Sequence, residues 1–243
     1  MARLTLETLT TRLTEVLGSR LVTLLLYGSA ARAARVEPAP NYNTLLLVDA
    51  VDDDLFARIE PVVRKWTSAG NPAPLIFTAQ EWRTTSDAFP IEYEDIREAH
   101  RLLAGRSPWD GITVRPDHVR RQLEHELMGK LVHLRQAYAA YWNDRARMAA
   151  VLADTFAGFL TMLRAVLRLS GRAPPAPPAP PADVLRDAGT LVGFDAAALE
   201  RLAVAASRDT PVKLAPHDPL PAAYLAAVAR TAEHVNRMER TLS

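Results

Sequence analysis

The fold is decided by residues 21–49, which read LVTLLLYGSAARAARVEPAPNYNTLLLVD. Two apolar runs, Leu21–Leu26 and Thr44–Val48, have the length and the flanking turn residues of buried strands. Gly28 and Ser29 follow the first run, and such a pair leaves backbone N–H groups and a hydroxyl where a phosphate group would fit. The alternative is structural: Gly28 gives a tight turn and Ser29 caps a short helix.

Two asparagines stand at the entrance of the second run. Asn41 and Asn43 are two residues apart, so on a strand their side chains point to the same face. The alternative is that they shape the turn that leads into the strand. Arg32 and Arg35 lie just behind the Gly-Ser pair, where they are either phosphate clamps or surface arginines on a short helix.

This strand, Gly-Ser turn and strand resemble the nucleotidyltransferase superfamily that includes DNA polymerase beta and the aminoglycoside nucleotidyltransferases. In that family the turn cradles the phosphates, and two acids in the pattern Asp-x-Asp on the second strand bind metal. A third acid on a later strand completes the site. The resemblance implies that Gly28, Ser29 and Arg32 bind phosphate, and it puts Asn41 and Asn43 at the metal-acid positions.

The resemblance also implies a third acid, for which Glu92 and Glu94 are the candidates. If residues 89–93 form a strand, both carboxylates share one face, and Glu92 best fits an apolar-acid-apolar pattern. The alternative is that both are surface glutamates on an edge strand. An amide oxygen brings no charge to Mg²⁺, a hard cation that loses its water reluctantly. We therefore expect Mg²⁺ at Asn41, Asn43 and Glu92 to be weakly bound or absent, with ATP or another nucleoside triphosphate as the ligand.

Composition describes a soluble globular protein. The 243 residues are 49% apolar, and the net charge is +1, which favours neither a nucleic acid nor an anionic membrane as partner. The chain has no cysteine, which excludes disulfides and thiolate chemistry. Its N-terminus does not read as a signal peptide, and its most apolar stretch, 156–169, is shorter than a bilayer-spanning helix. We expect a cytoplasmic protein.

The pattern along the chain predicts an α+β fold in two domains. Residues 1–115 alternate helical and strand-like patterns, which predicts a nucleotidyltransferase-like mixed sheet with flanking helices. Residues 116–243 carry long helical stripes and predict an α-helical bundle. The segment 173–181 (APPAPPAPP) predicts a stiff polyproline II connector, and an SH3-type ligand is the alternative. Residues 89–100 and the long helix pair are similar to uncharacterised bacterial nucleotidyltransferase-like proteins.

Histidines in the helical half suggest two further sites. Arg120 and His125 have the spacing of the ribonuclease motif in the HEPN helical family. His118, His125 and His133 could share a helix stripe as metal ligands, although solvated or core histidines explain the same spacing.

Three functional hypotheses follow. The first is a degenerate nucleotidyltransferase-like protein that binds a nucleotide or another small phosphorylated ligand between the domains. The second is an active enzyme that moves a nucleoside monophosphate from a nucleoside triphosphate to a small molecule or protein. The third is a helical interaction module that pairs with a second copy or a partner protein.

Overall fold

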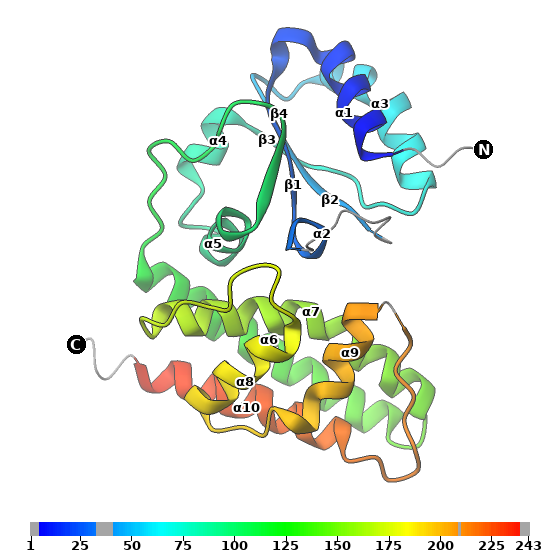
Figure 1. Ribbon diagram of the computed structural model, residues 1–243, viewed down its shortest axis with the longest axis vertical. Coiled ribbons are helices and arrows are strands. Elements are labelled where there is room, and N and C mark those ends of the chain that lie inside the picture. The colour runs from blue at the N-terminus through cyan, green and yellow to red at the C-terminus, as the bar shows by residue number, and fades with distance from the viewer. Residues whose placement is uncertain (1–4, 33–40, 209, 239–243) are drawn as a thin grey trace. The chain divides into compact units, whose positions relative to one another are not determined.

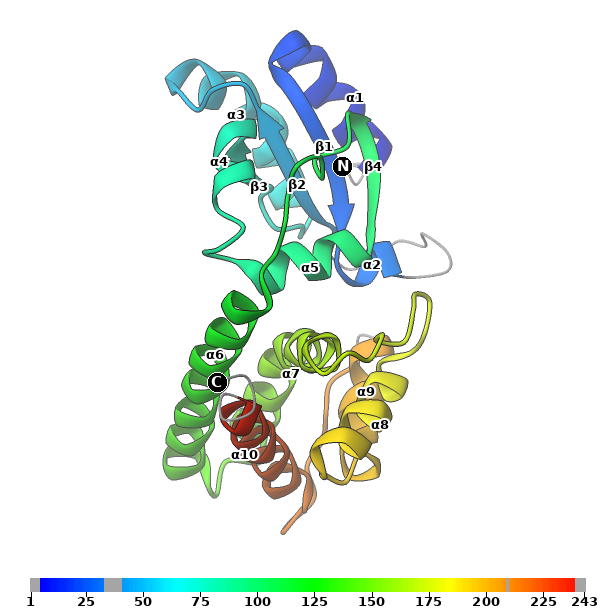
Figure 2. The same cartoon turned by 90° about the vertical axis from the view of Figure 1, so that its left-hand side faces the viewer.

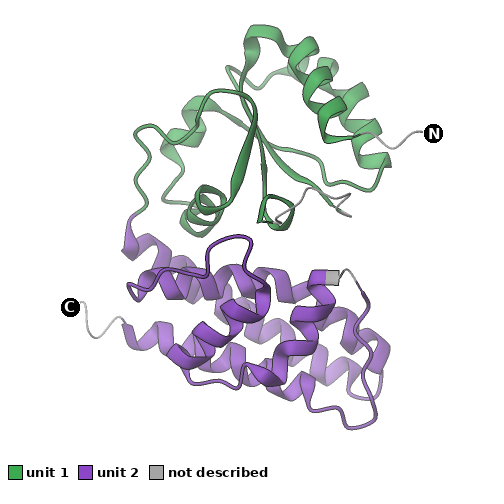
Figure 3. Cartoon of the chain, viewed as in Figure 1, with its two compact units in different colours: residues 1–114 green, residues 115–243 purple. Residues whose placement is uncertain are grey.

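The computed structural model describes residues 5–32, 41–208 and 210–238. The chain divides into two compact units, Met1–Val114 and Arg115–Ser243 (Figure 1, Figure 3). The first unit combines a sheet with helices and the second is helical, so the protein is a mixed α+β protein. Each unit is considered by itself below.

The described part of the first unit contains one four-stranded sheet with the order β3-β2-β1-β4. Its strands are β1 (Leu21–Tyr27), β2 (Asn43–Val48), β3 (Leu75–Thr78) and β4 (His100–Gly105). Strand β1 pairs antiparallel with both β2 and β4, and β2 pairs parallel with β3, so the sheet is mixed. The two apolar runs predicted as strands are confirmed, and they form the central pair of the sheet.

Each face of this sheet is covered by a different pair of helices. On one face, α1 (Leu6–Leu17) and α3 (Asp53–Ser68) pack on four alternate strand residues, which are Leu24, Leu26, Leu46 and Val48. On the other face, Trp82 of α4 (Ala79–Thr84) and Tyr93 of α5 (Pro90–Glu98) pack on Leu25, Leu45 and Leu47. Burial on both faces explains why β1 and β2 are continuous apolar runs instead of alternating patterns.

Local signals set most of the helix ends in this unit. Thr5 and Asp52 cap α1 and α3, and each side chain accepts a hydrogen bond from a backbone N–H of the first turn. Thr78 and Glu81 form a capping box at the start of α4. Gly18, whose φ is +51°, ends α1 and leads through the short 3-10 helix η1 (Gly18–Arg20) into β1. Apolar residues at helical spacing over 6–17 and 55–66 predict two helices, and α1 and α3 confirm them.

Two features of this unit differ from expectation. The expected strand over 89–93 is wrong, because these residues enter helix α5, which begins at Pro90. Proline suits the first helical position, where its fixed φ fits and no N–H is needed. Strand β4, which the sequence did not indicate, covers a mixed polar and apolar segment and pairs with β1.

The second unit consists of helices packed around α7 (Arg145–Leu169). The other helices are α6 (Pro116–Tyr141), α8 (Pro181–Val192), η2 (Ala197–Leu199), α9 (Glu200–Arg208) and α10 (Leu220–Met238). Asp144 caps α7 by accepting a hydrogen bond from the N–H of Arg147. Figure 2 shows α6 along one side of this unit with α10 beside it.

Helix α7 has the length and composition of a membrane-spanning segment. More than half of its most apolar window, 56%, is buried inside the protein. The helix is therefore the core helix of this unit, and its apolar character is explained by packing against α6, α8, α9 and α10.

The proline-rich segment 173–181 is not a single straight rod. The N–H of Ala179 donates a hydrogen bond to the carbonyl of Ala176, which makes a turn inside the segment. The expected connector between α7 and α8 is present, but the turn contradicts a continuous polyproline II helix.

A tight crossing of backbones occurs at the end of β4. A Cβ on Gly105 would lie 2.2 Å from the carbonyl oxygen of Val22, and Gly105 has φ of +81°. Gly111 has a similar φ of +74° but open space around it. The two glycines therefore differ mainly in steric room.

We expect Gly105→Ala to destabilise the protein much more than Gly111→Ala. Both changes incur about 1–2 kcal/mol for a side chain at positive φ. Only Gly105→Ala also forces a backbone shift, which adds roughly 1–3 kcal/mol. Urea unfolding of both variants measures the difference, and equal losses would show that Val22 moves aside freely.

Candidate functional site

The Gly-Ser turn lies at the end of β1, and the first residue of β2 contacts it. Gly28 has φ of +78°, and a Cβ placed on it would lie 3.1 Å from Nδ2 of Asn43. The left-handed backbone and the neighbouring amide both require a residue without a side chain. Helix α2 (Ser29–Arg32) begins directly after the turn, with Ser29 exposed. The sequence-predicted residues Gly28, Ser29 and Asn43 are therefore neighbours.

A row of polar side chains crosses the sheet at this end. Tyr27 is paired with Asn43 of β2 on one side and with His100 of β4 on the other. Residues that face each other across an antiparallel pair share one face of the sheet. Tyr27 packs against the cluster on the α5 face, so the whole row lies on that face. Tyr27 and His100 were not predicted as site residues; the position of Tyr27 just before Gly28 was the available signal.

His100 is held in one orientation by its neighbours. The indole N–H of Trp109 donates to Nε2 of His100 over 3.1 Å, and Nδ1 lies 3.1 Å from the carbonyl oxygen of Ile96. Nε2 is therefore an acceptor and Nδ1 carries the hydrogen. Both ring nitrogens are engaged within the protein, so His100 supports the row structurally.

Glu92 reaches this row from helix α5 and not from a strand. Because α5 is helical, Glu92 and Glu94 do not form the expected pair on one strand face. Glu94 lies 3.3 Å from Arg97, whereas Glu92 is exposed and its charge acts on Tyr27. Burial raises the pKa of Tyr27 to about 12, and the nearby carboxylate of Glu92 adds to the rise. The phenol therefore stays protonated at neutral pH.

Arg32 is bound to carboxylates of α5. Its Nη2 lies 2.6 Å from Oδ1 of Asp95 and its Nη1 lies 3.1 Å from Oε1 of Glu98. The side chain of Arg32 is only 11% exposed, so this is a largely buried ion pair that fastens α2 to α5. A phosphate role for Arg32 would require it to leave these partners. Arg35 lies outside the described residues.

The donor set at this end of the sheet does not fit two magnesium ions. Asn41 is exposed and precedes β2, Asn43 begins β2 beside the turn, and Glu92 is the one carboxylate among the three expected ligands. Two neutral amides and one carboxylate lack the negative charge that a pair of hard cations requires. Among the described residues, no group of three or more His, Asp or Glu side chains is arranged to hold a metal ion.

One arginine bridges three carboxylates of the acidic run after β2. Arg20 contacts carboxylates of Asp49, Asp52 and Asp54 at 3.1, 2.9 and 2.8 Å. The hydrogen bond from Arg20 is the main cause that holds the pKa of Asp49 below its usual value. Asp52, Asp53 and Asp54 lie at the start of α3, as their position before a helical pattern predicts, and Arg20 ties η1 to this start through Asp52 and Asp54.

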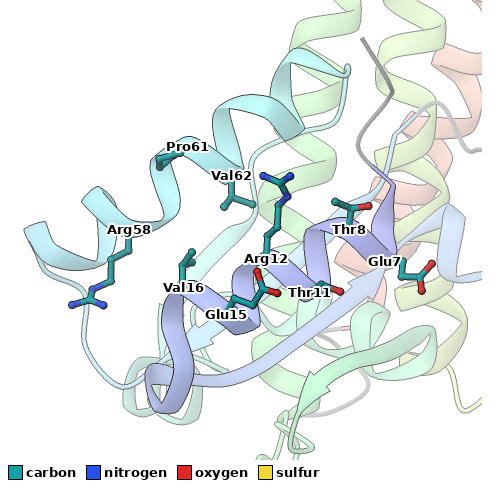
Figure 4. Close-up of a pocket in the computed structure, with 9 residues that line it drawn as sticks. All are labelled: Glu7, Thr8, Thr11, Arg12, Glu15, Val16, Arg58, Pro61 and Val62. Carbon is teal, nitrogen blue, oxygen red and sulfur yellow. The ribbon is translucent and has the colours of Figure 1, made fainter.

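A pocket of about 630 Å³ lies elsewhere in this unit, between α1 and α3 (Figure 4). It is lined by mixed charges and small side chains, including Glu7, Arg12, Glu15 and Arg58. Helices α1 and α3 cover the sheet face opposite to α5. The pocket therefore contains none of the residues around the Gly-Ser turn.

Among the described residues, the histidines of the helical unit belong to no group that could hold a metal ion, whereas the ribonuclease spacing of Arg120 and His125 stays a prediction. Arg120 lies 3.1 Å from Glu124, one turn along α6, with a side chain only 12% exposed. His125 and His133 are exposed on α6. Nothing in their surroundings gathers them around a ligand.

Comparison with known proteins adds no relative. No protein-family model matches the chain, and no curated protein matches it.

The pKa of Tyr27 provides a test of the geometry around the turn. We expect Glu92→Gln to lower the pKa of Tyr27 from about 12, but to leave it above the ordinary 10.0, because burial is the larger cause. The titration is followed by the ultraviolet absorbance of tyrosinate. The Tyr27→Phe variant identifies the part of the absorbance change that belongs to Tyr27. The neutral phenol stabilises the folded unit below pH 10, and this contribution is lost as the pH rises toward about 12. An unchanged pKa in Glu92→Gln would place Glu92 away from Tyr27.

Proposed function

We propose that the N-terminal unit is a nucleotidyltransferase-like binding domain without the two-metal centre of an active enzyme. It holds the phosphate group of a nucleotide, or of another small phosphorylated ligand, at the turn formed by Gly28 and Ser29. The observation that carries the proposal is the approach of the Asn43 amide to Gly28, at 3.1 Å from the position of a Cβ. The proposal therefore rests on the side-chain amide of Asn43, which begins β2 and contacts the turn.

The side chains around the turn supply hydrogen-bond donors that carry no charge. The Nδ2 group of Asn43, the hydroxyl of Ser29 and the protonated phenol of Tyr27 can each donate to an oxygen of a phosphate group. Their positions follow from the central strand pair, which brings the end of β1 and the start of β2 together. Such a set binds an anion without needing a metal ion as a bridge.

Catalysis of nucleotidyl transfer makes a further demand that these residues do not meet. The transfer needs divalent cations that bridge the triphosphate to acidic oxygens and stabilise the leaving pyrophosphate. Asn41 and Asn43 provide amides at those positions. We therefore assign the protein to a binding or regulatory class, active in the cytoplasm, and not to the nucleotidyltransferases that turn over substrate.

Titration with ATP tests this proposal. We expect calorimetry to detect binding whose affinity is nearly the same with Mg²⁺ and with a chelator. Ser29→Ala and Asn43→Ala should each weaken binding about tenfold, the effect of one lost hydrogen bond to a charged group. Thr11→Ala, which removes a hydroxyl from the pocket between α1 and α3, is the matched control and should change nothing.

Two outcomes of this titration would contradict the proposal. Binding that requires Mg²⁺ and releases pyrophosphate would show an active enzyme. Absence of binding to ATP, GTP and inorganic pyrophosphate would leave the turn with a purely structural role.

A double variant tests the position of the asparagines. We expect Asn41→Asp with Asn43→Asp to raise the affinity for Mn²⁺ and Mg²⁺ by at least about tenfold, because two charged oxygens replace two neutral ones. Calorimetry with the metal alone measures the change, and Asn143→Asp, at an exposed position of the other unit, is the control. If the double variant binds metal no better than the control, the two side chains do not converge on one site.

A further inference from the structure

The pocket between α1 and α3 is a feature of the N-terminal unit that the proposed function does not use. Its volume of about 630 Å³ falls within the range of small-molecule sites, roughly 300–1,000 Å³. All the side chains that line it come from these two helices (Figure 4). Both helices are anchored in the core beneath them, α1 by Leu9 and Leu13 and α3 by Ile59. The walls of the pocket are therefore held in place by buried packing.

Three of the four charged side chains that line the pocket have no ionic partner among the described residues. Arg58 is the exception, since its Nε lies 2.7 Å from Oδ2 of Asp54. The other three are Glu7, Arg12 and Glu15, and all of them lie on α1. Arg12 and Glu15 are three residues apart and hence neighbours on the helix surface, but they do not pair with each other. Their charges are therefore available to a ligand.

The balance of these charges selects the kind of ligand. Two carboxylates outnumber one guanidinium, so an anion such as a phosphate group is repelled. A simple cation is attracted by the carboxylates but meets the like charge of Arg12. A zwitterion presents an ammonium group to a glutamate and a carboxylate to the arginine, so it satisfies both signs. The pocket therefore favours a ligand different from the one proposed for the Gly-Ser turn.

Apolar side chains lie beside these charges. Val62 of α3 is buried and Val16 of α1 is half-buried, and both line the pocket. Figure 4 shows the side chain of Arg12 extending from α1 toward Val62. A ligand whose carboxylate contacts Arg12 therefore has an apolar surface next to it, where an apolar side chain is removed from water.

We propose that the pocket binds a free α-amino acid with an apolar side chain. The guanidinium of Arg12 donates hydrogen bonds to the carboxylate of the ligand. The carboxylate of Glu15 accepts hydrogen bonds from the α-ammonium group, and the apolar side chain packs on Val16 and Val62. An α-amino acid carries its two charged groups on one carbon atom, which matches two opposite charges that are neighbours on one helix.

Isothermal titration calorimetry of the full chain with leucine, valine and methionine, each at up to about 10 mM, tests this inference. We expect at least one of them to bind with a dissociation constant below about 1 mM. The amide of that amino acid lacks the carboxylate, and its N-acetyl derivative lacks the ammonium group. Each derivative should bind at least about tenfold more weakly than the amino acid itself.

Two variants remove the proposed ligand contacts singly. Arg12→Gln and Glu15→Gln should each weaken binding of the amino acid at least about tenfold. Arg64→Gln and Glu60→Gln are the matched controls, because both residues are exposed on α3 and lie outside the pocket lining. The control variants should bind like the unmodified chain. All four positions are exposed, and circular dichroism verifies that the variants remain folded.

Three results would overturn the proposal. The first is the absence of binding for all three amino acids. The second is an amide or N-acetyl derivative that binds as tightly as the amino acid, since the pocket would then not recognise both charges. The third is binding that Arg12→Gln and Glu15→Gln leave unchanged, or that the control variants weaken equally. The titrations contain no nucleotide and the pocket contains none of the residues around the Gly-Ser turn, so these results are independent of the proposed function.

Discussion

Strand β1 is hydrogen-bonded along both edges and buried on both faces, and the N-terminal unit depends on this arrangement. Leu24, Leu25 and Leu26 have no exposed surface, and β2 and β4 occupy the two edges. A strand in this position cannot shift its register without exposing leucines on one face and breaking two ladders. The residue that follows the strand is therefore fixed in space, and that residue is Gly28.

The chemistry around the turn follows from this constraint. Because Tyr27 and Asn43 are register partners, the amide of Asn43 comes to rest beside Gly28. Helix α5 adds Glu92 on the same side, and Arg32 fastens α2 to α5 through Asp95 and Glu98. The side chains around the turn are therefore mainly neutral and lack the negative charge that coordination of two cations requires.

The two longest helices of the helical unit differ in burial. Helix α7 is buried among its neighbours and supplies the core, including Phe156, Phe159 and Leu163. Helix α6 buries one face in the same core and exposes the other. A surface helix needs only one apolar face for folding.

The sequence by itself determined the elements whose signals are local. Apolar runs, caps and helical stripes gave strands β1 and β2, helices α1 and α3, and the long helices α6 and α7, because these signals involve residues within a few positions of each other. The Gly-Ser turn and the entrance asparagine Asn43 were found in the same way. Only the tertiary structure decided that residues 100–105 form a strand, since their mixed pattern becomes a strand through pairing with β1. It also decided that residues 90–98 form a helix that brings Glu92 to Tyr27, and that Arg20 and Arg32 bind acids 29 to 66 residues away. Contacts between segments so far apart produce no periodic pattern in the sequence, because the packing of the whole unit decides which residues meet.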